Sequence, residues 1–216
     1  MSVKYPVMAI IPNRHNFYDE FTRGAADATV WTSGGDAGSY TRVQVANSAT
    51  AWQLQTGGTT DNDRYIHGGS VKENNYFGPF EHDLKSVTWE ARVQLPQITD
   101  ISVFVGLLAT VITDYAEPTA VCAHFVVDPA VSANWLARTF ETAEEQTDTG
   151  VALSTAWVRL KMIWTANYVK FFINDALVAT HSTRVPNINM TSELLVRTEA
   201  DDVKYLRVDY VHVELV

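Results

Sequence analysis

The chain contains one cysteine, Cys122, among its 216 residues. An intramolecular disulfide is therefore excluded, and the fold must be held by its apolar core. No apolar stretch approaches the roughly 20 residues of a membrane span. Pro6 and Pro12 interrupt the short apolar part of residues 1–12, which is unlike the apolar core of a secretion signal. These absences predict synthesis and folding in a reducing host cytoplasm, and no membrane as partner.

Positive charge is also scarce and scattered. The 16 Lys and Arg residues are outnumbered by 25 Asp and Glu residues, which gives a net charge of -9. Nucleic-acid binding requires a basic patch, and no run of Lys or Arg is present. We therefore expect no nucleic-acid partner. Neutral or weakly charged partners, including sugars and other proteins, remain open.

Helical periodicity is absent, and short alternating segments take its place. Ser86–Leu95 alternates strictly between apolar and polar residues, and Ala156–Trp164 places Val158, Leu160, Met162 and Trp164 on one face. Apolar runs on either side of Asn174-Asp175 are typical of a β-hairpin. Such consecutive strands predict an all-β sandwich or barrel, with no linker that would divide it.

The first 14 residues form an apolar segment of their own. We expect an N-terminal arm at 1–14, followed by a single β-sandwich domain at 15–216. The arm is either an edge strand or strap across the core, or a docking and oligomerisation segment. Its candidate docking side chains are Tyr5, Val7, Met8, Ile10 and Ile11.

Three passages together resemble the concanavalin A-like lectin/glucanase superfamily. They are Trp89–Pro96 followed by Val105-Gly106-Leu107, then Ala156–Thr180, and finally Leu206–Val213. The resemblance implies a two-sheet antiparallel jelly-roll sandwich. The sequence is also similar in style to jelly-roll domains of bacteriophage virion proteins, such as head decorations and tail fibres.

Hydrolases of this superfamily place their acids on one strand, as Glu-x-Asp-x-x-Glu. The corresponding strand here is Val121–Val127, whose solvent-side residues would be Cys122, His124 and Val126. None of them is an acid, whereas glycoside hydrolysis needs two carboxylates. The resemblance therefore implies that the chain is not an enzyme. Cys122 and His124 could form a nucleophile pair, but no third orienting group can be named.

One loop offers candidate ligands for a metal ion. Asp61, Asn62 and Asp63 offer oxygen ligands for calcium, but the glycine and the distal glutamate of an EF-hand loop are missing. Cys122 and His124 alone fall short of a zinc site. The sequence therefore predicts no metal and no cofactor.

Sugar binding by a β-sandwich usually uses exposed aromatic rings beside hydrogen-bonding groups. Trp135 and Tyr115 lie in or near predicted loops, and Glu90 and Arg92 would share an open face with His124. These five residues are the candidate glycan site. The alternative is ordinary packing for the rings and a cross-strand ion pair for Glu90 and Arg92.

The leading hypothesis is a non-enzymatic virion structural protein, located in the virion, that docks on capsid or tail subunits. We expect a homo-oligomer, for which a trimer would suit a decoration protein. The alternative is a lectin-like module that binds polysaccharide for host attachment. A glycoside hydrolase with unusual catalytic residues is the third hypothesis.

Overall fold

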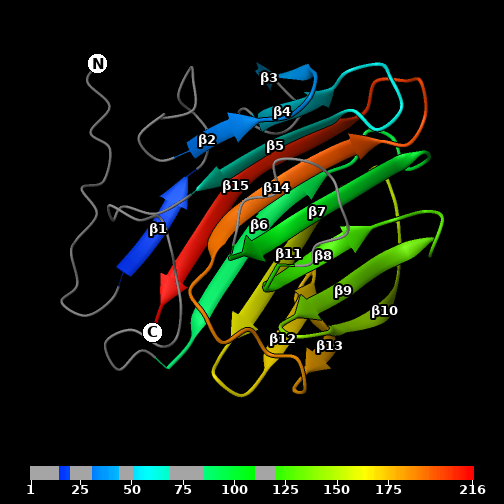
Figure 1. Ribbon diagram of the computed structural model, residues 1–216. Coiled ribbons are helices and arrows are strands. Elements are labelled where there is room, and N and C mark those ends of the chain that lie inside the picture. The colour runs from blue at the N-terminus through cyan, green and yellow to red at the C-terminus, as the bar shows by residue number, and fades with distance from the viewer. Residues whose placement is uncertain (1–14, 20–30, 44–50, 69–84, 110–119) are drawn as a thin grey trace, which may run out of the picture.

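The computed structural model describes residues 15–19, 31–43, 51–68, 85–109 and 120–216. Fifteen β-strands and no helix occur in these ranges, and the strands form two antiparallel sheets (Figure 1). The predicted all-β, two-sheet antiparallel architecture is confirmed. No helix in the described ranges has the length and apolarity needed to cross a membrane. The expected arm at 1–14 and Tyr115 fall outside these ranges, so the domain boundary stays a prediction.

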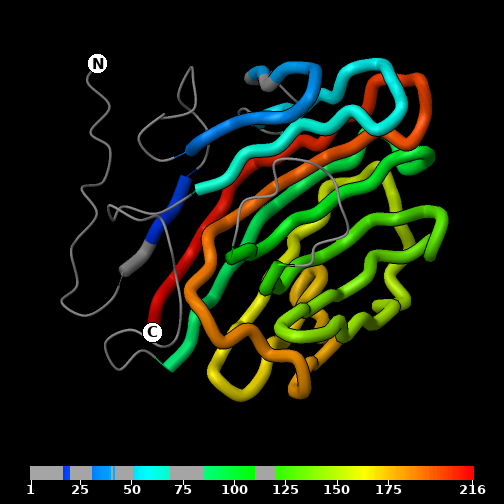
Figure 2. The backbone as a smooth tube through the Cα atoms, in the orientation of Figure 1, coloured from blue at the N-terminus to red at the C-terminus, as the bar shows by residue number. Residues whose placement is uncertain are grey.

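The eight-stranded sheet has the order β13-β12-β11-β6-β15-β4-β3, with β1 also paired to β15. Its strands are β1 (His15–Asp19), β3 (Gly38–Val43), β4 (Ala51–Thr56), β6 (Val87–Gln94), β11 (Trp157–Trp164), β12 (Val169–Ile173), β13 (Ala176–His181) and β15 (Tyr205–Leu215). The first and last described strands therefore lie side by side, as the blue and red segments of Figure 2 show.

The seven-stranded sheet has the order β10-β9-β8-β7-β14-β5-β2. Its strands are β2 (Trp31–Gly34), β5 (Asp63–Gly68), β7 (Ile101–Leu108), β8 (Cys122–Val127), β9 (Asn134–Phe140), β10 (Glu144–Ala152) and β14 (Thr191–Thr198). In Figure 1, the green strands β7 to β10 lie in front of the yellow strands β11 to β13. Each sheet thus has one face toward the other sheet and one outer face.

The core between the sheets follows from the alternation in the sequence. Every second residue of β6 and β11 is buried, including Trp89 and Trp164, which are both fully covered. Buried indole N–H groups need acceptors. Trp89 Nε1 donates to Ser192 Oγ at 3.0 Å, and Trp164 Nε1 donates to the Pro186 carbonyl at 3.1 Å. The first of these bonds ties β6 to β14 of the opposite sheet.

The predicted hairpin at Asn174-Asp175 is confirmed. Both residues have positive φ angles, 48° and 69°, as a type I′ turn requires. The turn joins β12 to β13, which pair antiparallel. Asn and Asp tolerate this region better than other non-glycine residues, so the pair replaces the Asn-Gly more often found there.

Other segments differ from expectation. The acidic sequence of Glu141–Thr149 favours a charged hairpin tip, but Glu144–Ala152 is the edge strand β10. Its exposed residues alternate with partly buried ones, and the strand pairs with β9 on one side. The polar sequence of Gly57–Gly69 favours a loop, but Asp63–Gly68 is the strand β5, and its Asp63 is fully buried. Strand β14 was not expected at all.

Irregular pairing marks one side of the sandwich. The ladder between β9 and β10 shifts between Asp148 and Ala152, next to Gly150, whose φ is 70°. The ladder between β12 and β13 shifts between Phe171 and Phe172. Strands β10 and β13 end their respective sheets. Both edges on this side therefore adjoin a bulge-type irregularity.

Candidate functional site

The outer face of the seven-stranded sheet contains the strand that the resemblance singled out. Strand β8 points Ala123, Phe125 and Val127 into the core between the sheets. Cys122, His124 and Val126 therefore lie on the outer face, as predicted, but they are buried rather than exposed. Val126 belongs to a second apolar cluster on this face, with Tyr65, Phe104, Leu136 and Leu195.

A row of polar residues crosses this outer face. Strand register aligns one residue from each of six neighbouring strands, namely His67, Glu193, Gly106, His124, Arg138 and Gln146. Glu193 is 3% exposed and Arg138 is 4% exposed. Arg138 donates two hydrogen bonds to Gln146 Oε1, at 3.0 and 2.7 Å, and forms an ion pair with Glu144 at 3.3 Å.

His124 occupies the middle of this row. Burial, followed by the nearby charge of Arg138, lowers its pKa to about 3. The imidazole is therefore neutral at physiological pH. Together with Glu193 it lines a cavity of about 10 Å³, which has room for one water molecule. This part of the face is too small to hold a sugar.

The Cys122–His124 nucleophile pair receives no support. Burial raises the pKa of the Cys122 thiol well above its ordinary value, so the thiol stays protonated. His124 Nε2 has no hydrogen-bond partner among the described residues. A buried neutral thiol beside a neutral imidazole is a packing arrangement and offers no thiolate for attack.

A larger pocket opens at one end of the same sheet. Its volume is about 520 Å³, and it is lined by Thr99, Asp100, Ser102, Asp128, Pro129, Ala130 and Glu199. The three acids come from the segment before β7, the turn after β8 and the end of β14. Because β7 pairs antiparallel with both β8 and β14, the start of β7 meets the ends of the other two strands. We call this site the acidic pocket.

The backbone around the acidic pocket is fixed by local hydrogen bonds. The Glu199 amide donates to the Asp100 carbonyl at 2.9 Å, which joins two of the three acidic segments. Asp128 Oδ1 accepts a hydrogen bond from the Ala130 amide at 3.0 Å. This Asx-type contact shapes the turn after β8. Asp100 has a φ of 51°, a conformation that aspartate tolerates.

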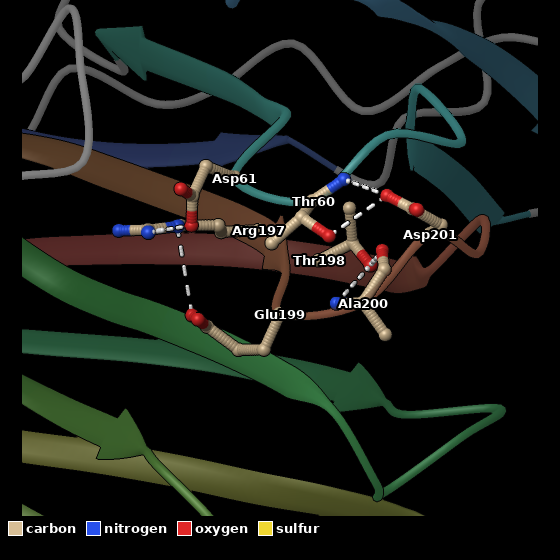
Figure 3. Close-up of polar contacts among 7 residues, drawn as sticks. All are labelled: Thr60, Asp61, Arg197, Thr198, Glu199, Ala200 and Asp201. Carbon is tan, nitrogen blue, oxygen red and sulfur yellow. Dashed lines mark hydrogen bonds and ion pairs between the residues drawn. The ribbon is translucent and has the colours of Figure 1, made fainter.

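An arginine supports the third acid of the pocket. The Arg197 side chain is 14% exposed and lies between Asp61 and Glu199, as Figure 3 shows. It forms an ion pair with each of these carboxylates, and its Nε lies 3.5 Å from Glu199 Oε1. Beside it, Thr60 holds Asp201 through its amide and hydroxyl, at 2.9 and 2.8 Å. These hydrogen bonds lower the pKa of Asp201.

Sequence reasoning missed Asp100, Asp128 and Glu199. The available signal was positional, since Asp100 directly precedes the apolar run that begins at Ile101, and Asp128 directly follows the predicted strand Val121–Val127. Antiparallel neighbours bring such positions together at one end of a sheet. The third acid could not be found because its strand, β14, was not predicted.

The candidate glycan residues do not form one site. Glu90 and Arg92 are on β6, so they face outward from the eight-stranded sheet, whereas His124 is on the outer face of the other sheet. The expectation of a shared face is therefore wrong. Trp135 was expected near a loop, but it lies on β9 and is 2% exposed in the core, so its ring is not a surface platform. Tyr115 falls outside the described residues.

The candidate calcium loop is held by protein contacts. Asp61 pairs with Arg197, and Asn62 Oδ1 accepts a hydrogen bond from the Thr59 amide at 3.4 Å. Asp63 Oδ1 accepts a hydrogen bond from the Asp36 amide at 3.2 Å. In the described part of the chain, no group of three or more His, Cys, Asp or Glu residues could hold a metal ion.

Comparison with known proteins gives relatives by structure only. No protein-family model matches the sequence, and no curated protein matches it. Among solved structures, a glycoside hydrolase family 16 endo-glucanase from Bacteroides ovatus has a TM-score of 0.65 at 13% identity, covering 91% of this chain and 99% of that one.

Two further structures give similar values. The laminarinase catalytic domain from Thermotoga maritima has a TM-score of 0.64 at 13% identity, with 92% and 96% of the two chains covered. A glycosyl hydrolase family protein from Mycobacterium fortuitum has a TM-score of 0.62 at 16% identity, with 91% and 98% covered. At these identities the likeness is one of fold.

These neighbours correct the leading hypothesis. The prediction of a non-enzymatic virion structural protein is wrong, because the solved structures that share the fold are glucanases and laminarinases. The inference that the chain is not an enzyme is corrected on the same ground. It relied on missing acid pairs within predicted strands, whereas Asp100, Asp128 and Glu199 lie at strand ends and line the acidic pocket.

The virion association receives no support from any of the structures compared. The fold is established by the strand order, the two-layer core and the coverage of these neighbours. The chain is a concanavalin A-like jelly roll of the type found in glycoside hydrolase family 16.

Proposed function

We propose that this protein is carbohydrate-active and that it binds and cleaves a neutral β-glucan at the acidic pocket. One observation carries the proposal. Three carboxylates from three separate segments, Asp100, Asp128 and Glu199, line one pocket of about 520 Å³. Pockets of roughly 300–1,000 Å³ are typical of small-ligand sites. The glucanases and laminarinases that share the fold support the choice of substrate.

The residue types suit the chemistry of glycoside hydrolysis. One carboxylic acid protonates the leaving oxygen, and a second carboxylate attacks the sugar or activates a water molecule. The pocket supplies three candidates for these two roles. The hydroxyl groups of Thr99 and Ser102 also line the pocket and can exchange hydrogen bonds with sugar hydroxyls. This mechanism does not need acids on β8, because the three acids at the strand ends take their place.

The test is a reducing-sugar assay with laminarin and with a mixed-linkage β-glucan. We expect turnover by the unmodified chain, and a loss of roughly 10²–10⁴-fold in kcat when either of the two reacting carboxylates is neutralised. The variants are Asp100→Asn, Asp128→Asn and Glu199→Gln. Two of them should be nearly inactive, and the third should retain activity with a raised KM.

Glu141→Gln is the matched control. Glu141 follows β9 at the end opposite the acidic pocket, and its Oε1 accepts a hydrogen bond from Asn187, which glutamine can also accept. Binding of the same glucans is measured in parallel by affinity electrophoresis. Glucan binding without turnover would refute the hydrolytic half of the proposal. Neither binding nor turnover would refute it entirely.

A further inference from the structure

Cationic side chains gather on the outer face of the eight-stranded sheet. Arg92 on β6, Arg159 and Lys161 on β11, and Lys170 on β12 all occupy positions that alternate with buried core residues. They therefore point away from the core on three neighbouring strands. We call this surface the basic face. It lies on the opposite side of the sandwich from the outer face of the seven-stranded sheet.

The strand register places two like charges directly opposite each other. Arg92 and Arg159 are Cα partners in the antiparallel ladder between β6 and β11, and the side chain of each is 38% exposed. Like charges at directly opposed positions destabilise a sheet. Because Arg92 and Arg159 are opposed and partly exposed, their two guanidinium groups face the same region of solvent.

Each arginine has one carboxylate partner and keeps further N–H donors. Arg92 Nη1 lies 2.6 Å from Asp209 Oδ2, and Arg159 Nη2 pairs with Asp175 at the neighbouring hairpin turn. A guanidinium has five N–H donors, and the remaining donors of both residues have no acceptor among the described residues. Lys161 lies opposite Glu90 in the ladder between β6 and β11 and contacts the ring of Phe172, and Lys170 contacts the ring of Tyr168.

Aromatic rings border the two arginines. The Arg92 guanidinium lies 5.0 Å from the ring centroid of Trp157. Tyr18, which is 46% exposed, contacts Tyr210 with ring centroids 5.7 Å apart. Tyr210 in turn donates a hydrogen bond to Glu90 at 2.5 Å, so its ring is fixed beside the arginines. Aromatic faces of this kind stack on the apolar faces of sugar rings.

We propose that the basic face binds an acidic polysaccharide, whose sugars carry carboxylate or sulfate groups. Two paired guanidinium groups match such planar or tetrahedral anions through several hydrogen bonds at once, which a lysine does not provide. The adjacent rings supply the stacking surface for the sugar itself. Charge complementarity supports this ligand, because four cationic side chains collect here in a chain whose net charge is -9, although Glu90 and Asp209 lie among them.

This binding is independent of the glucan proposed for the acidic pocket. That pocket presents carboxylates, which repel an acidic sugar, whereas the basic face presents guanidinium groups. The two surfaces belong to different sheets, so one chain could hold both ligands at the same time.

The experiment measures binding of the full chain to alginate, to dextran sulfate and to neutral dextran by affinity electrophoresis and calorimetry. We expect binding of at least one of the two acidic polymers, weakening with added salt, and no retardation by neutral dextran. The double variant Arg92→Gln/Arg159→Gln should bind at least about tenfold more weakly. A preference for alginate or for dextran sulfate identifies the anionic group.

Two controls separate a built site from simple charge attraction. Arg184→Gln removes one charge at a residue that contacts Thr142, outside the basic face. Trp157→Leu keeps both arginines but removes the ring beneath Arg92. We expect unchanged affinity for the first and weakened affinity for the second, with unfolding midpoints that show both variants folded. Equal losses in the Arg184 variant and the double variant, or no binding of either acidic polymer, would overturn the proposal.

Discussion

His124 on β8 and Glu193 on β14 line one small cavity, although the strand β7 runs between theirs. The intervening residue in this row is Gly106, which has no side chain to separate them. A Cβ atom at Gly106 would lie 2.5 Å from the Ala123 carbonyl oxygen and 2.6 Å from His124 Cβ. The His124 side chain therefore occupies the space in which a side chain at position 106 would lie.

Gly106→Ala is expected to destabilise the fold. The added methyl group collides with backbone atoms of β8, which cannot move without breaking the ladder. Overpacking of this kind costs about 1–3 kcal/mol of unfolding free energy. Urea unfolding measures it, and Gly58→Ala is the control, because a Cβ at Gly58 meets only Val203 at 3.6 Å. Equal midpoints for the two variants would contradict the steric argument.

The stability of the fold should depend on His124 in acid. Burial lowers its pKa from 6.5 to about 3, so between these values the unfolded chain binds a proton that the folded chain does not. Stability therefore decreases as the pH falls from 6.5 toward 3, by up to about 1.4 kcal/mol per pH unit from this residue. Above pH 6.5 this residue contributes no slope.

Urea unfolding between about pH 4 and 7 measures this slope. The variant His124→Gln removes the titrating group, so its stability should fall less steeply with acid. Burial also lowers the pKa of His181 and of His67, so a smaller slope of the same sign remains in the variant. Parallel curves for the two proteins would show that His124 is not buried in its neutral form.

The Cys122 thiol should be inert in the folded protein. It is fully buried, and burial raises its pKa above the ordinary value, which leaves almost no thiolate. We expect no reaction with Ellman's reagent under native conditions and one equivalent per chain after unfolding in urea. Rapid labelling of the native protein would contradict the position of β8.

Gly150→Ala tests a backbone angle without a steric clash. Gly150 has a φ of 70°, but no atom lies within 4 Å of an added Cβ. The left-handed conformation costs an alanine about 1 kcal/mol, so the variant should unfold at a slightly lower urea concentration. Gly150→Asn is the matched comparison, because asparagine tolerates this region. It should lose less stability than the alanine variant, and the reverse order would contradict the left-handed backbone conformation of Gly150.

Alternation in the sequence was enough to predict much of the fold. The inward faces of β6 and β11 follow directly from the period of two in Ser86–Leu95 and Ala156–Trp164. A strand that is buried on both faces lacks this alternation, so it is harder to predict from the sequence. In β14, seven of the eight residues are buried, so no polar alternation marks it as a strand. Trp135 is the second residue of β9, so its place near a loop was no sign that its ring points into the core.

The acidic pocket could not be predicted from spacing along the chain. Asp128 and Glu199 are far apart in sequence and meet only because β8 and β14 flank β7 on its two sides. The same cause separates Glu90 and Arg92 from His124. Alternation shows that a residue faces outward, but the sheet to which its strand belongs decides on which side of the molecule it lies.

The irregular ladders beside β10 and β13 bear on self-association. An incoming strand from another molecule would need a regular row of backbone donors and acceptors. On β10 that row is interrupted near Gly150, and its exposed side chains include Glu144. On β13 the shift opposite Phe171 and Phe172 interrupts it again. Fibrous stacking through this border is therefore disfavoured, even at concentrations where a flat, apolar edge would polymerise.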